Sequence, residues 1–271
     1  MKLQSIRQFS NQDNIEYWDN IYDQPDFNGE CYRQRMGIVL SWLESMRLSE
    51  NSIILDAGSG TGRFAYEVIN RGYKVVGIDY SHSMTVKASR SYIPMSKQNE
   101  AFLQGDVETL PFQNSTFEVI VCLGVVAYLK TEGKALRELA RVLKPNGVIA
   151  ISIVNKARLA NRLDLPFLLS ILIKRVKYGI TAIWKRGNEN NDSDSLTTFL
   201  IPKFINSLEL AGFTVQEYQT VPWKLLTFFG MEILPKKIAE KITLFFEQFS
   251  NIPMVGSFGG MCIIRAEKIS N

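Results

Sequence analysis

The stretch Ile53-Ile54-Leu55-Asp56-Ala57-Gly58-Ser59-Gly60-Thr61-Gly62-Arg63 decides the fold of this chain. A short apolar strand ends in an acid, three glycines follow with one residue between each, and an apolar helical pattern begins directly afterwards. A strand, a glycine-rich turn and a helix in this order are typical of α/β sheets whose backbone approaches a nucleotide-like ligand. The stretch therefore predicts a ligand-binding turn at the end of a buried parallel strand.

The spacing of the glycines argues against a dinucleotide as that ligand. The dinucleotide fingerprint is G-x-G-x-x-G, and Arg63 occupies the position of its third glycine here. The observed spacing is G-x-G-x-G, with Asp56 just before it. A carboxylate at the end of the strand suits a cationic group better than a pyrophosphate. S-adenosylmethionine (SAM) carries an ammonium and a sulfonium and no phosphate, so we expect it as the ligand.

The composition is that of an ordinary globular protein. The chain has 271 residues, of which 46% are hydrophobic and 21% charged, enough for one large domain or one domain with a substantial insertion. The net charge of +4 comes without a dense run of lysine and arginine, so we expect no nucleic-acid partner. Three separated cysteines argue against a disulfide scaffold, and no cysteine–histidine cluster indicates a metal. With no signal peptide visible, we expect a cytoplasmic protein.

Apolar strands alternate with helices along most of the chain. We expect strands at 53–56, 74–79, 101–104, 117–123, 148–153, 213–220 and 260–266. We expect helices at 14–22, 31–46, 63–70, 83–92, 132–143 and 202–211, and Lys144-Pro145-Asn146-Gly147 should end the fifth of them and turn the chain into the next strand. The alternation predicts an α/β fold, a Rossmann-like seven-stranded and mostly parallel sheet with helices on both faces. Its ligand should lie beyond the carboxyl ends of the strands, where the strand order reverses.

The pattern divides the chain into four parts. We expect lid helices in 1–50, the ligand-binding core in 51–154, a helical insertion in 155–200 and the rest of the core in 201–271. A second insertion interrupts the last part at 222–253, and both insertions are rich in Leu, Ile and Phe. They predict an apolar roof over the substrate. Lysines and arginines alternate with apolar residues in the first insertion, which indicates peripheral membrane contact through 155–186. Packing of these helices on each other, or a dimer, is the alternative, and the oligomeric state stays open.

Five motifs occur in a characteristic order. They are Leu55-Asp56-Ala57-Gly58-Ser59-Gly60-Thr61-Gly62, Gly77-Ile78-Asp79-Tyr80-Ser81, Gly105-Asp106-Val107-Glu108-Thr109-Leu110-Pro111-Phe112, Phe117-Glu118-Val119-Ile120-Val121 and Arg141-Val142-Leu143-Lys144-Pro145-Asn146-Gly147-Val148. This order resembles the class I SAM-dependent methyltransferases, especially the branch that acts on small molecules. The resemblance covers 50–155 closely and 198–267 loosely. It implies SAM as cofactor, S-adenosylhomocysteine (SAH) as product and no metal, and it says almost nothing of the acceptor.

The resemblance implies a cofactor contact for each position that matches a motif. The backbone of Gly58, Ser59 and Gly60 would approach the methionyl part of SAM, and Asp56 would lie near its ammonium. The positions implied for the remaining parts of the cofactor are Asp79 for the ribose, Tyr80 and Met84 for the two faces of the adenine, Asp106 and the Val107 amide for its edge, and Leu123 for the sulfonium. For Met84 and Leu123 the alternative is simple core packing, and for Asp106 it is a turn.

The N-terminal segment resembles the lid helix that such enzymes fold over SAM. Tyr22, Tyr32 and Arg35 would contact the carboxylate of the cofactor, and an arginine can do so with a bidentate pair of hydrogen bonds. The alternative is the ordinary packing of an amphipathic helix.

Two residues are candidates for catalysis, Tyr128 and His82. Many relatives have a histidine pair shortly after the fourth strand, and this chain has Val126-Ala127-Tyr128 there. A phenol with an ordinary pKa of about 10 is a poor base at neutral pH, but it can orient an acceptor hydroxyl. His82, the only histidine, begins the helix expected to face the ribose, where capping or a surface position is the alternative.

The expected activity is methyl transfer from SAM to a hydrophobic or amphipathic small molecule, with oxygen slightly favoured as the accepting atom. An RNA or protein methyltransferase is one alternative, although no Asn/Asp-Pro-Pro-Tyr motif follows the fourth strand and no basic domain is appended. A non-catalytic SAM-binding partner subunit is the other alternative, because the sequence shows no obvious general base.

Overall fold

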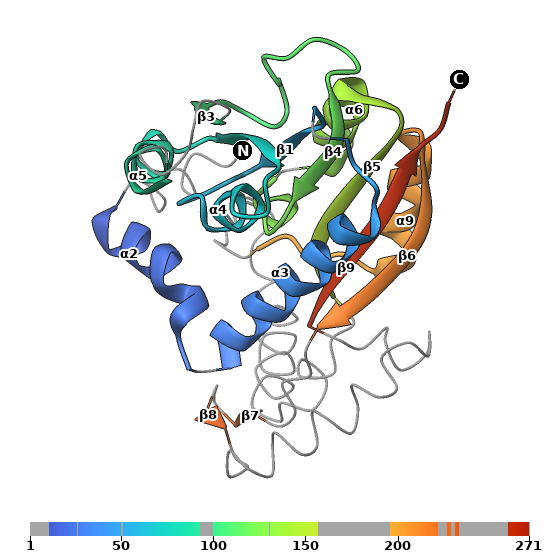
Figure 1. The fold of residues 1–271 in the computed structure, drawn as a ribbon. Helices are drawn as coiled ribbons and strands as arrows, with labels where there is room; N and C mark the ends of the chain where they lie inside the picture. The colour runs from blue at the N-terminus through green and yellow to red at the C-terminus, as the bar shows by residue number, and fades with distance from the viewer. Residues whose placement is uncertain are drawn as a thin grey trace, which may run out of the picture.

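Seven strands form one sheet at the centre of the protein (Figure 1). The computed structural model describes residues 11–25, 27–49, 51–92, 100–129, 131–156, 196–221, 227–228, 231–232 and 260–270. The strands are β1 (Ile53–Ala57), β2 (Lys74–Asp79), β3 (Glu100–Gln104), β4 (Phe117–Cys122), β5 (Leu143–Val154), β6 (Phe213–Val221) and β9 (Met261–Lys268). Their order is β3-β2-β1-β4-β5-β9-β6, and β9 runs antiparallel to both of its neighbours. The other neighbouring pairs are parallel, so the expected α/β fold with a mostly parallel sheet is confirmed.

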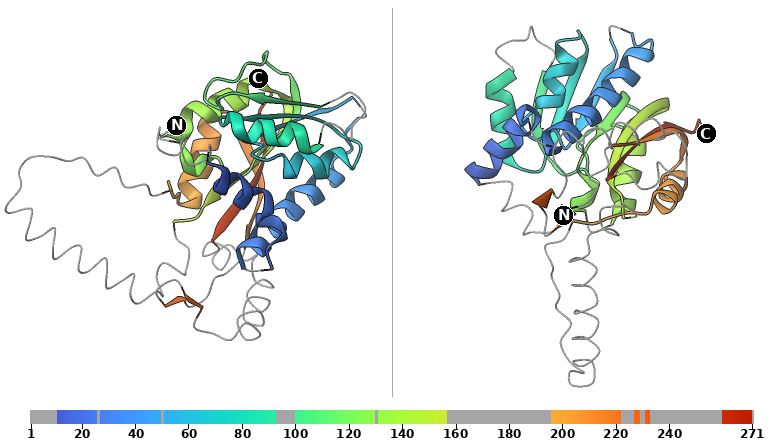
Figure 2. Two further views of the ribbon diagram at one scale, coloured as in Figure 1. Left: turned by 90° about the vertical axis from the view of Figure 1, so that its left-hand side faces the viewer. Right: turned by 90° about the horizontal axis from the view of Figure 1, so that it is seen from below.

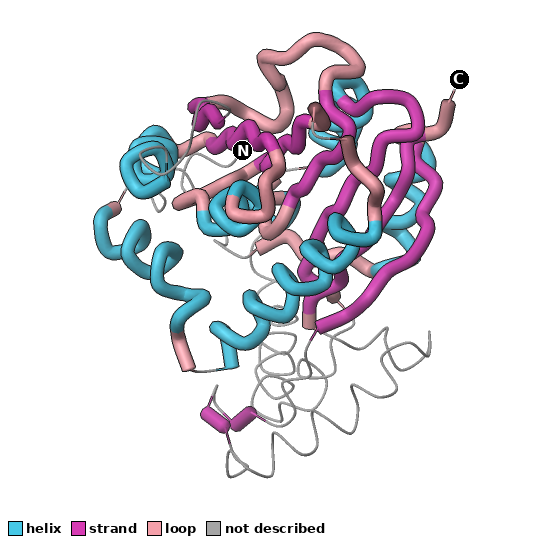
Figure 3. Tube along the Cα trace, viewed as in Figure 1, coloured by secondary structure: helices cyan, strands magenta, loops and turns pink. Residues whose placement is uncertain are grey.

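Helices cover both faces of this sheet (Figures 2 and 3). They are α2 (Gln12–Asn20), η1 (Ile21–Asp23), α3 (Phe27–Ser45), α4 (Arg63–Ile69), α5 (His82–Tyr92), η3 (Val126–Tyr128), α6 (Glu132–Val142) and α9 (Ile201–Leu210). Buried side chains of α3 and α4 pack on one face, and those of α6 and α9 pack on the other. A separate hairpin pairs β7 (Thr227–Phe228) with β8 (Met231–Glu232). Within the described ranges, no helix is long and apolar enough to cross a bilayer.

Strand β1 shows why its sequence is continuously apolar. Successive side chains of a strand point to opposite faces, so Ile54 packs with α3 and α4, while Leu55 packs with α6 and α9. Both side chains are completely buried. A strand covered on both faces has no position that tolerates a polar side chain until it reaches the edge of the sheet, where Asp56 and the glycines begin.

The second half of helix α3 packs against the sheet. Its buried residues Val39, Leu40, Trp42 and Leu43 join the same core cluster as α4 and the central strands. The first expected part of the chain, 1–50, therefore contains a helix whose second half covers the core. The division into four parts stays a prediction, and the two insertions at 155–200 and 222–253 lie mostly outside the described residues.

The segment Lys144-Pro145-Asn146-Gly147 does not separate a helix from a strand, and this prediction was wrong. Helix α6 ends at Val142, and β5 begins at the next residue. The pairing of β4 with β5 passes from Phe117–Leu143 to Val119–Val148, so the segment is a bulge opposite Glu118. Lys144 forms an ion pair with Glu118 in this bulge, and Asn146 adopts a φ of 60°.

Two leucines of α9 provide a matched test of the core. Leu208 is fully buried against the sheet, whereas Leu210 is 81% exposed. We expect Leu208→Ala to lower the free energy of unfolding by about 2–5 kcal/mol, because it leaves a cavity under the helix, and Leu210→Ala to change it by less than about 0.5 kcal/mol. Urea denaturation of both variants measures the difference, and equal effects would contradict this packing of α9.

Candidate functional site

A cavity opens at the carboxyl ends of the central strands β2, β1 and β4. Its empty space, including the part open to solvent, is about 1170 Å³. It is lined by Trp18, Tyr22, Tyr32, Arg35, Asp56, Gly58, Ser59, Gly60, Thr61, Arg63, Phe64, Asp79, Tyr80, Met84, Gly105, Val107, Leu123, Gly124, Val125, Ala127, Tyr128, Val154, Leu196 and Met261. The strand order reverses at β1 and β4, so the cavity lies where open α/β sheets bind their ligands.

The glycine turn after β1 is held by the tip of β2. The amides of Gly58 and Ser59 donate to the carbonyl oxygen of Ile78 at 2.7 and 3.0 Å. Gly58 has a φ of 83°, and a Cβ atom there would lie 2.0 Å from Cγ2 of Val125. Glycine therefore suits this position both for its conformation and for the close approach of Val125, which follows β4.

Asp79 connects the ends of β1 and β2. Its Oδ2 accepts a hydrogen bond from the Gly60 amide at 2.9 Å, and its Oδ1 accepts one from the Ser81 amide at 2.8 Å. Burial raises the pKa of this carboxyl, although the two amides oppose the shift. This contact with the glycine turn was not predicted from the sequence. Each carboxylate oxygen keeps a second lone pair that can accept a ligand hydroxyl.

Asp56 is a buried acid without a partner for one of its oxygens. The side chain is 3% exposed, and Oδ2 has no hydrogen-bond partner among the described residues. Burial and, to a lesser extent, the charge of Asp79 raise the pKa of Asp56 to about 7, although Arg35 and a backbone hydrogen bond from Ala65 oppose the shift. A desolvated carboxylate in a cavity wall is stabilised by a cationic group, and the ammonium of SAM fits this requirement.

Arg35, from α3, is a buried cation in the same lining. It is 4% exposed, Nη2 donates to the Tyr22 hydroxyl at 3.1 Å, and its guanidinium carbon lies 4.5 Å from the centroid of the Tyr32 ring. Nε has no partner within the part of the chain that the structure describes. The ring of Trp18, from α2, packs edge-on against Tyr32 with 5.6 Å between centroids. The arrangement can hold a carboxylate, and it joins three N-terminal elements that the sequence could only place separately.

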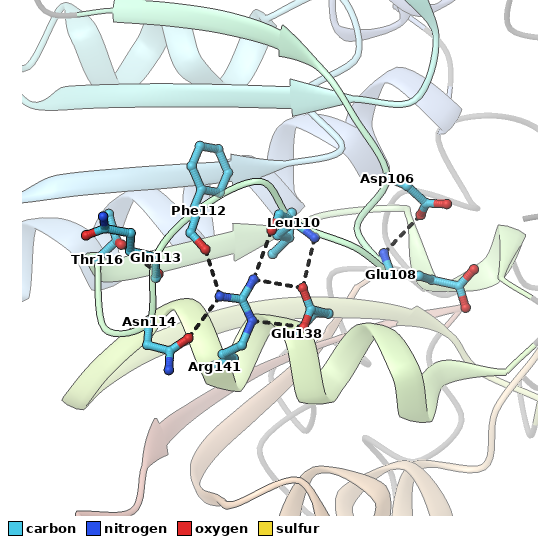
Figure 4. Close-up of polar contacts among 9 residues, drawn as sticks. All are labelled: Asp106, Glu108, Leu110, Phe112, Gln113, Asn114, Thr116, Glu138 and Arg141. Carbon is cyan, nitrogen blue, oxygen red and sulfur yellow. Dashed lines mark hydrogen bonds and ion pairs between the residues drawn. The ribbon is translucent and has the colours of Figure 1, made fainter.

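The far end of the cavity, beyond β2, has an aromatic and apolar lining. Tyr80, Met84 and Val107 line it as expected, together with Gly105. Asp106 does not belong to the lining. Its Oδ1 accepts a hydrogen bond from the Glu108 amide at 2.9 Å (Figure 4). Its carbonyl oxygen accepts one from the Thr109 amide at 2.9 Å. An aspartate that bonds the backbone two residues ahead stabilises a turn, which is the alternative that the sequence left open.

The two catalytic candidates lie in different places. Tyr128, at the end of η3, lines the cavity, and burial raises the pKa of its hydroxyl, so the phenol stays protonated and can donate a hydrogen bond. His82 is exposed at the start of α5 and borders a separate hollow against β3, beside Phe102 and Gln104. The structure therefore does not bring His82 to the cavity.

The two halves of the cavity differ in chemistry. Both acids of the lining, Asp56 and Asp79, come from β1 and β2. The half above β4, β5 and β9 is lined by Leu123, Val125, Ala127, Val154, Leu196 and Met261. Tyr128 is a polar member of this half, and Arg35 borders it, since a Cβ atom at Gly124 would lie 3.0 Å from Arg35 Nη1. Val154, Leu196 and Met261 were not predicted, because pairing between distant segments brings them together, including the hydrogen bond from the Phe199 amide to the Val154 carbonyl at 2.9 Å.

Comparisons with known proteins agree with this geometry. Residues 55–151 match the family described as a methyltransferase domain. The chain contains a class I SAM-dependent methyltransferase domain. A magnesium protoporphyrin IX methyltransferase from Synechocystis PCC 6803, solved with bound SAH, has a similar fold, with a TM-score of 0.60 and 15% identity over 98% of this chain and 99% of that one.

Two curated relatives share part of this methyltransferase domain. The ubiquinone biosynthesis O-methyltransferase of Rickettsia canadensis is 27% identical over 143 residues, which is 53% of this chain and 56% of the relative. The tRNA (carboxymethyluridine(34)-5-O)-methyltransferase of Arabidopsis thaliana is 31% identical over 143 residues, 51% of this chain and 32% of the relative. The chain thus spans about half the length, or less, of the curated relatives it matches.

The buried carboxyl of Asp56 predicts how the stability of the domain depends on pH. The pKa of Asp56 rises from 3.8 to about 7 on folding, so the folded protein binds this proton more tightly than the unfolded chain does. The resulting stabilisation of the fold is complete below pH 3.8 and is lost as the pH rises through about 7. One such proton contributes a slope of about 1.4 kcal/mol per pH unit within that window. Urea denaturation at several pH values should show this loss. Asp56→Asn should remove the contribution of this group to the pH dependence of the free energy of unfolding.

The control for this measurement is Glu209→Gln, which changes an exposed acid of α9. It should leave the slope unchanged. A slope that is the same in the original protein and in Asp56→Asn would show that another group carries the pH dependence.

Proposed function

We propose that this protein transfers a methyl group from SAM to an apolar or amphipathic small molecule, with oxygen as the accepting atom. The observation that carries the proposal is the division of the cavity into a charged half and an apolar half. A methyltransferase needs both, because the donor is a charged amino-acid nucleoside and the acceptor has to displace water from the sulfonium. The matched residues 55–151 supply the two acids of the first half and α3 supplies Arg35, while residues 154, 196 and 261 complete the second half.

The amino-acid end of SAM fits two buried groups of opposite sign. Asp56 would bind the ammonium and Arg35 the carboxylate, because each has a buried polar atom without a partner among the described residues. The backbone of Gly58, Ser59 and Gly60 would approach the same end of the cofactor. A zwitterion satisfies both side chains at once, whereas a phosphate would satisfy Arg35 and meet repulsion at Asp56.

The nucleoside end would occupy the cavity beyond β2. Asp79 would accept the ribose hydroxyls, Tyr80 and Met84 would enclose the adenine, and the Val107 amide would donate to its edge. Asp106 would act indirectly, since it shapes the turn that carries Val107. These assignments rest on the lining of the cavity and on the family resemblance.

When bound, SAM supplies an activated methyl group on a positively charged sulfur. The chain has to align the acceptor with this methyl group and exclude water. Alignment alone can lower the activation barrier by several kcal/mol. Leu123 would form the floor beneath the sulfonium, and the apolar residues above β4 and β5 would surround the acceptor. The protonated hydroxyl of Tyr128 would donate a hydrogen bond to the acceptor and fix its orientation.

The names of the two curated relatives support oxygen as the accepting atom, since both are O-methyltransferases. They act on different classes of molecule by name, so the apolar half of the cavity is what favours a small apolar acceptor over RNA. The cytoplasmic location, and the membrane contact of 155–186, stay predictions.

Titration with SAH tests the cofactor assignment. We expect Asp79→Ala to weaken SAH binding by about tenfold or more, because it removes charge-assisted hydrogen bonds to the ribose and the bond that holds Gly60. Glu209→Ala, at an exposed acid of α9, should leave the affinity unchanged. Calorimetry measures both, and the proposal fails if the original protein binds NAD or ATP in place of SAH, or binds none of them.

Tyr128→Phe tests the acceptor half. We expect about a tenfold lower kcat and unchanged SAH affinity, because the change removes one oriented hydroxyl and keeps the ring. Radioactive methyl transfer to phenols, free acids, a lipid extract and RNA identifies the acceptor class and then measures kcat. Tyr73→Phe is the control, since Tyr73 precedes β2 at the opposite edge of the sheet. Unchanged turnover in Tyr128→Phe would return this residue to a packing role, and transfer to RNA alone would overturn the small-molecule proposal.

A further inference from the structure

We propose that Arg141 and Glu138 of α6 are positioning residues that set the specificity for the adenine of the cofactor. They would act through the segment 105–112, which follows β3 and is called the adenine loop below. The inference rests on the proposed function, because it takes the Val107 amide as the group that reads the adenine edge. Neither residue lines the cavity.

All five N–H groups of Arg141 are used, and they join α6 to the adenine loop and the residues after it (Figure 4). Nη2 donates to the Leu110 carbonyl at 2.9 Å, and Nη1 donates to the Phe112 carbonyl at 2.7 Å and to Asn114 Oδ1 at 3.0 Å. Nε and Nη2 donate to the two carboxylate oxygens of Glu138, both at 2.9 Å. A guanidinium with every donor engaged in a fixed fork has one orientation, so it transmits the position of α6 to the loop.

Glu138 completes the attachment of Leu110. Its Oε2 accepts a hydrogen bond from the Leu110 amide at 2.9 Å, so both backbone groups of this residue are bound to α6. The hydrogen bond from Arg141 lowers the pKa of Glu138, which keeps the acceptor ionised at neutral pH. The helix itself is fixed, because Leu136 and Leu139 are fully buried on its other face.

The position of Val107 follows from two attached ends. At the start of the adenine loop, the Gly105 amide donates to the Asp79 carbonyl at 2.9 Å. At its end, Leu110 is bound to α6. Between them runs the turn that Asp106 closes, and the side chains of Val107 and Leu110 are both buried in the core. The Val107 backbone has little freedom as long as Leu110 stays in place.

Recognition of adenine by a backbone amide depends on this precision. Adenine presents an unprotonated N1 acceptor beside its exocyclic amine, whereas hypoxanthine presents an N1–H donor beside a carbonyl. A donor amide held in register favours the first and meets another donor in the second, so the discrimination comes from a buried polar group left unpaired. A loop that can shift would accommodate both bases and lose that difference.

The test compares SAH with S-inosyl-L-homocysteine, which carries hypoxanthine in place of adenine. We expect the original protein to prefer SAH by at least about tenfold, and Arg141→Gln to lose most of that preference by weakening SAH binding while changing the inosyl analogue by less than about twofold. Glu138→Gln, which keeps an oxygen for the Leu110 amide, should give an intermediate ratio and serves as the measurement if Arg141→Gln does not fold.

Arg137→Gln is the matched control. Arg137 is an exposed arginine on the same helix, one turn before Arg141, and its loss should leave both affinities and the melting temperature unchanged. Equal weakening of the two ligands in Arg141→Gln and Glu138→Gln would show a merely structural role and overturn the inference, as would an unchanged ratio. Failure of the original protein to bind either ligand would instead overturn the proposed function, and this inference with it.

Discussion

The cavity depends on one close approach, that of the glycine turn after β1 to the ends of its two neighbouring strands. The amides of Gly58 and Ser59 are bound to the carbonyl of Ile78 on β2, while the side of Gly58 faces Val125 after β4 at a distance that excludes any Cβ atom. Asp79 adds a side-chain bond from β2 to the same turn. The turn therefore locks the charged half of the cavity to the apolar half, because Val125 belongs to the lining of the latter. A side chain at Gly58 would force the Val125 side chain to move and would strain a backbone with a φ of 83°.

Charge follows from this geometry. The turn brings two carboxylates from adjacent strand ends into a buried space, and burial together with their mutual repulsion raises the pKa of Asp56. Arg35 opposes that shift from α3, yet one atom of each side chain keeps no partner in the described part of the molecule. The fold thus tolerates polar groups whose desolvation is not fully offset by their neighbours. A ligand that brings one positive and one negative group recovers that free energy, and this makes the free amino-acid end of SAM a better match than any phosphate ester.

The sequence predicted the parts of this site that lie within one local pattern. Apolar runs indicated the strands and the glycine spacing indicated the turn. The cavity is lined by residues for which the sequence predicts cofactor contacts, among them Asp56, Asp79, Tyr80, Met84 and Val107. Features that depend on pairing between distant segments were out of reach. Met261 reaches the cavity because β9 runs antiparallel and begins at this edge, and nothing in residues 260–266 states the direction of the strand. The two readings of Asp106 differ only in which hydrogen bond the carboxylate makes, and its own backbone turn was the nearer partner. The role of Arg141 was also out of reach, because its hydrogen bonds to Leu110 and Phe112 form only where α6 lies beside the adenine loop.

The origin of the two halves explains why one fold can serve different acceptors. The acids of the charged half, Asp56 and Asp79, come from β1 and β2 within the matched residues 55–151, and its cation, Arg35, comes from α3. The apolar half takes Val154, Leu196 and Met261 from beyond that region, where the chain is free to change without disturbing the glycine turn. Selection on the acceptor can therefore act on these residues and on the insertions next to them, while the contacts around Gly58 and Asp79 stay fixed. Specificity for the donor and specificity for the acceptor are then physically separable.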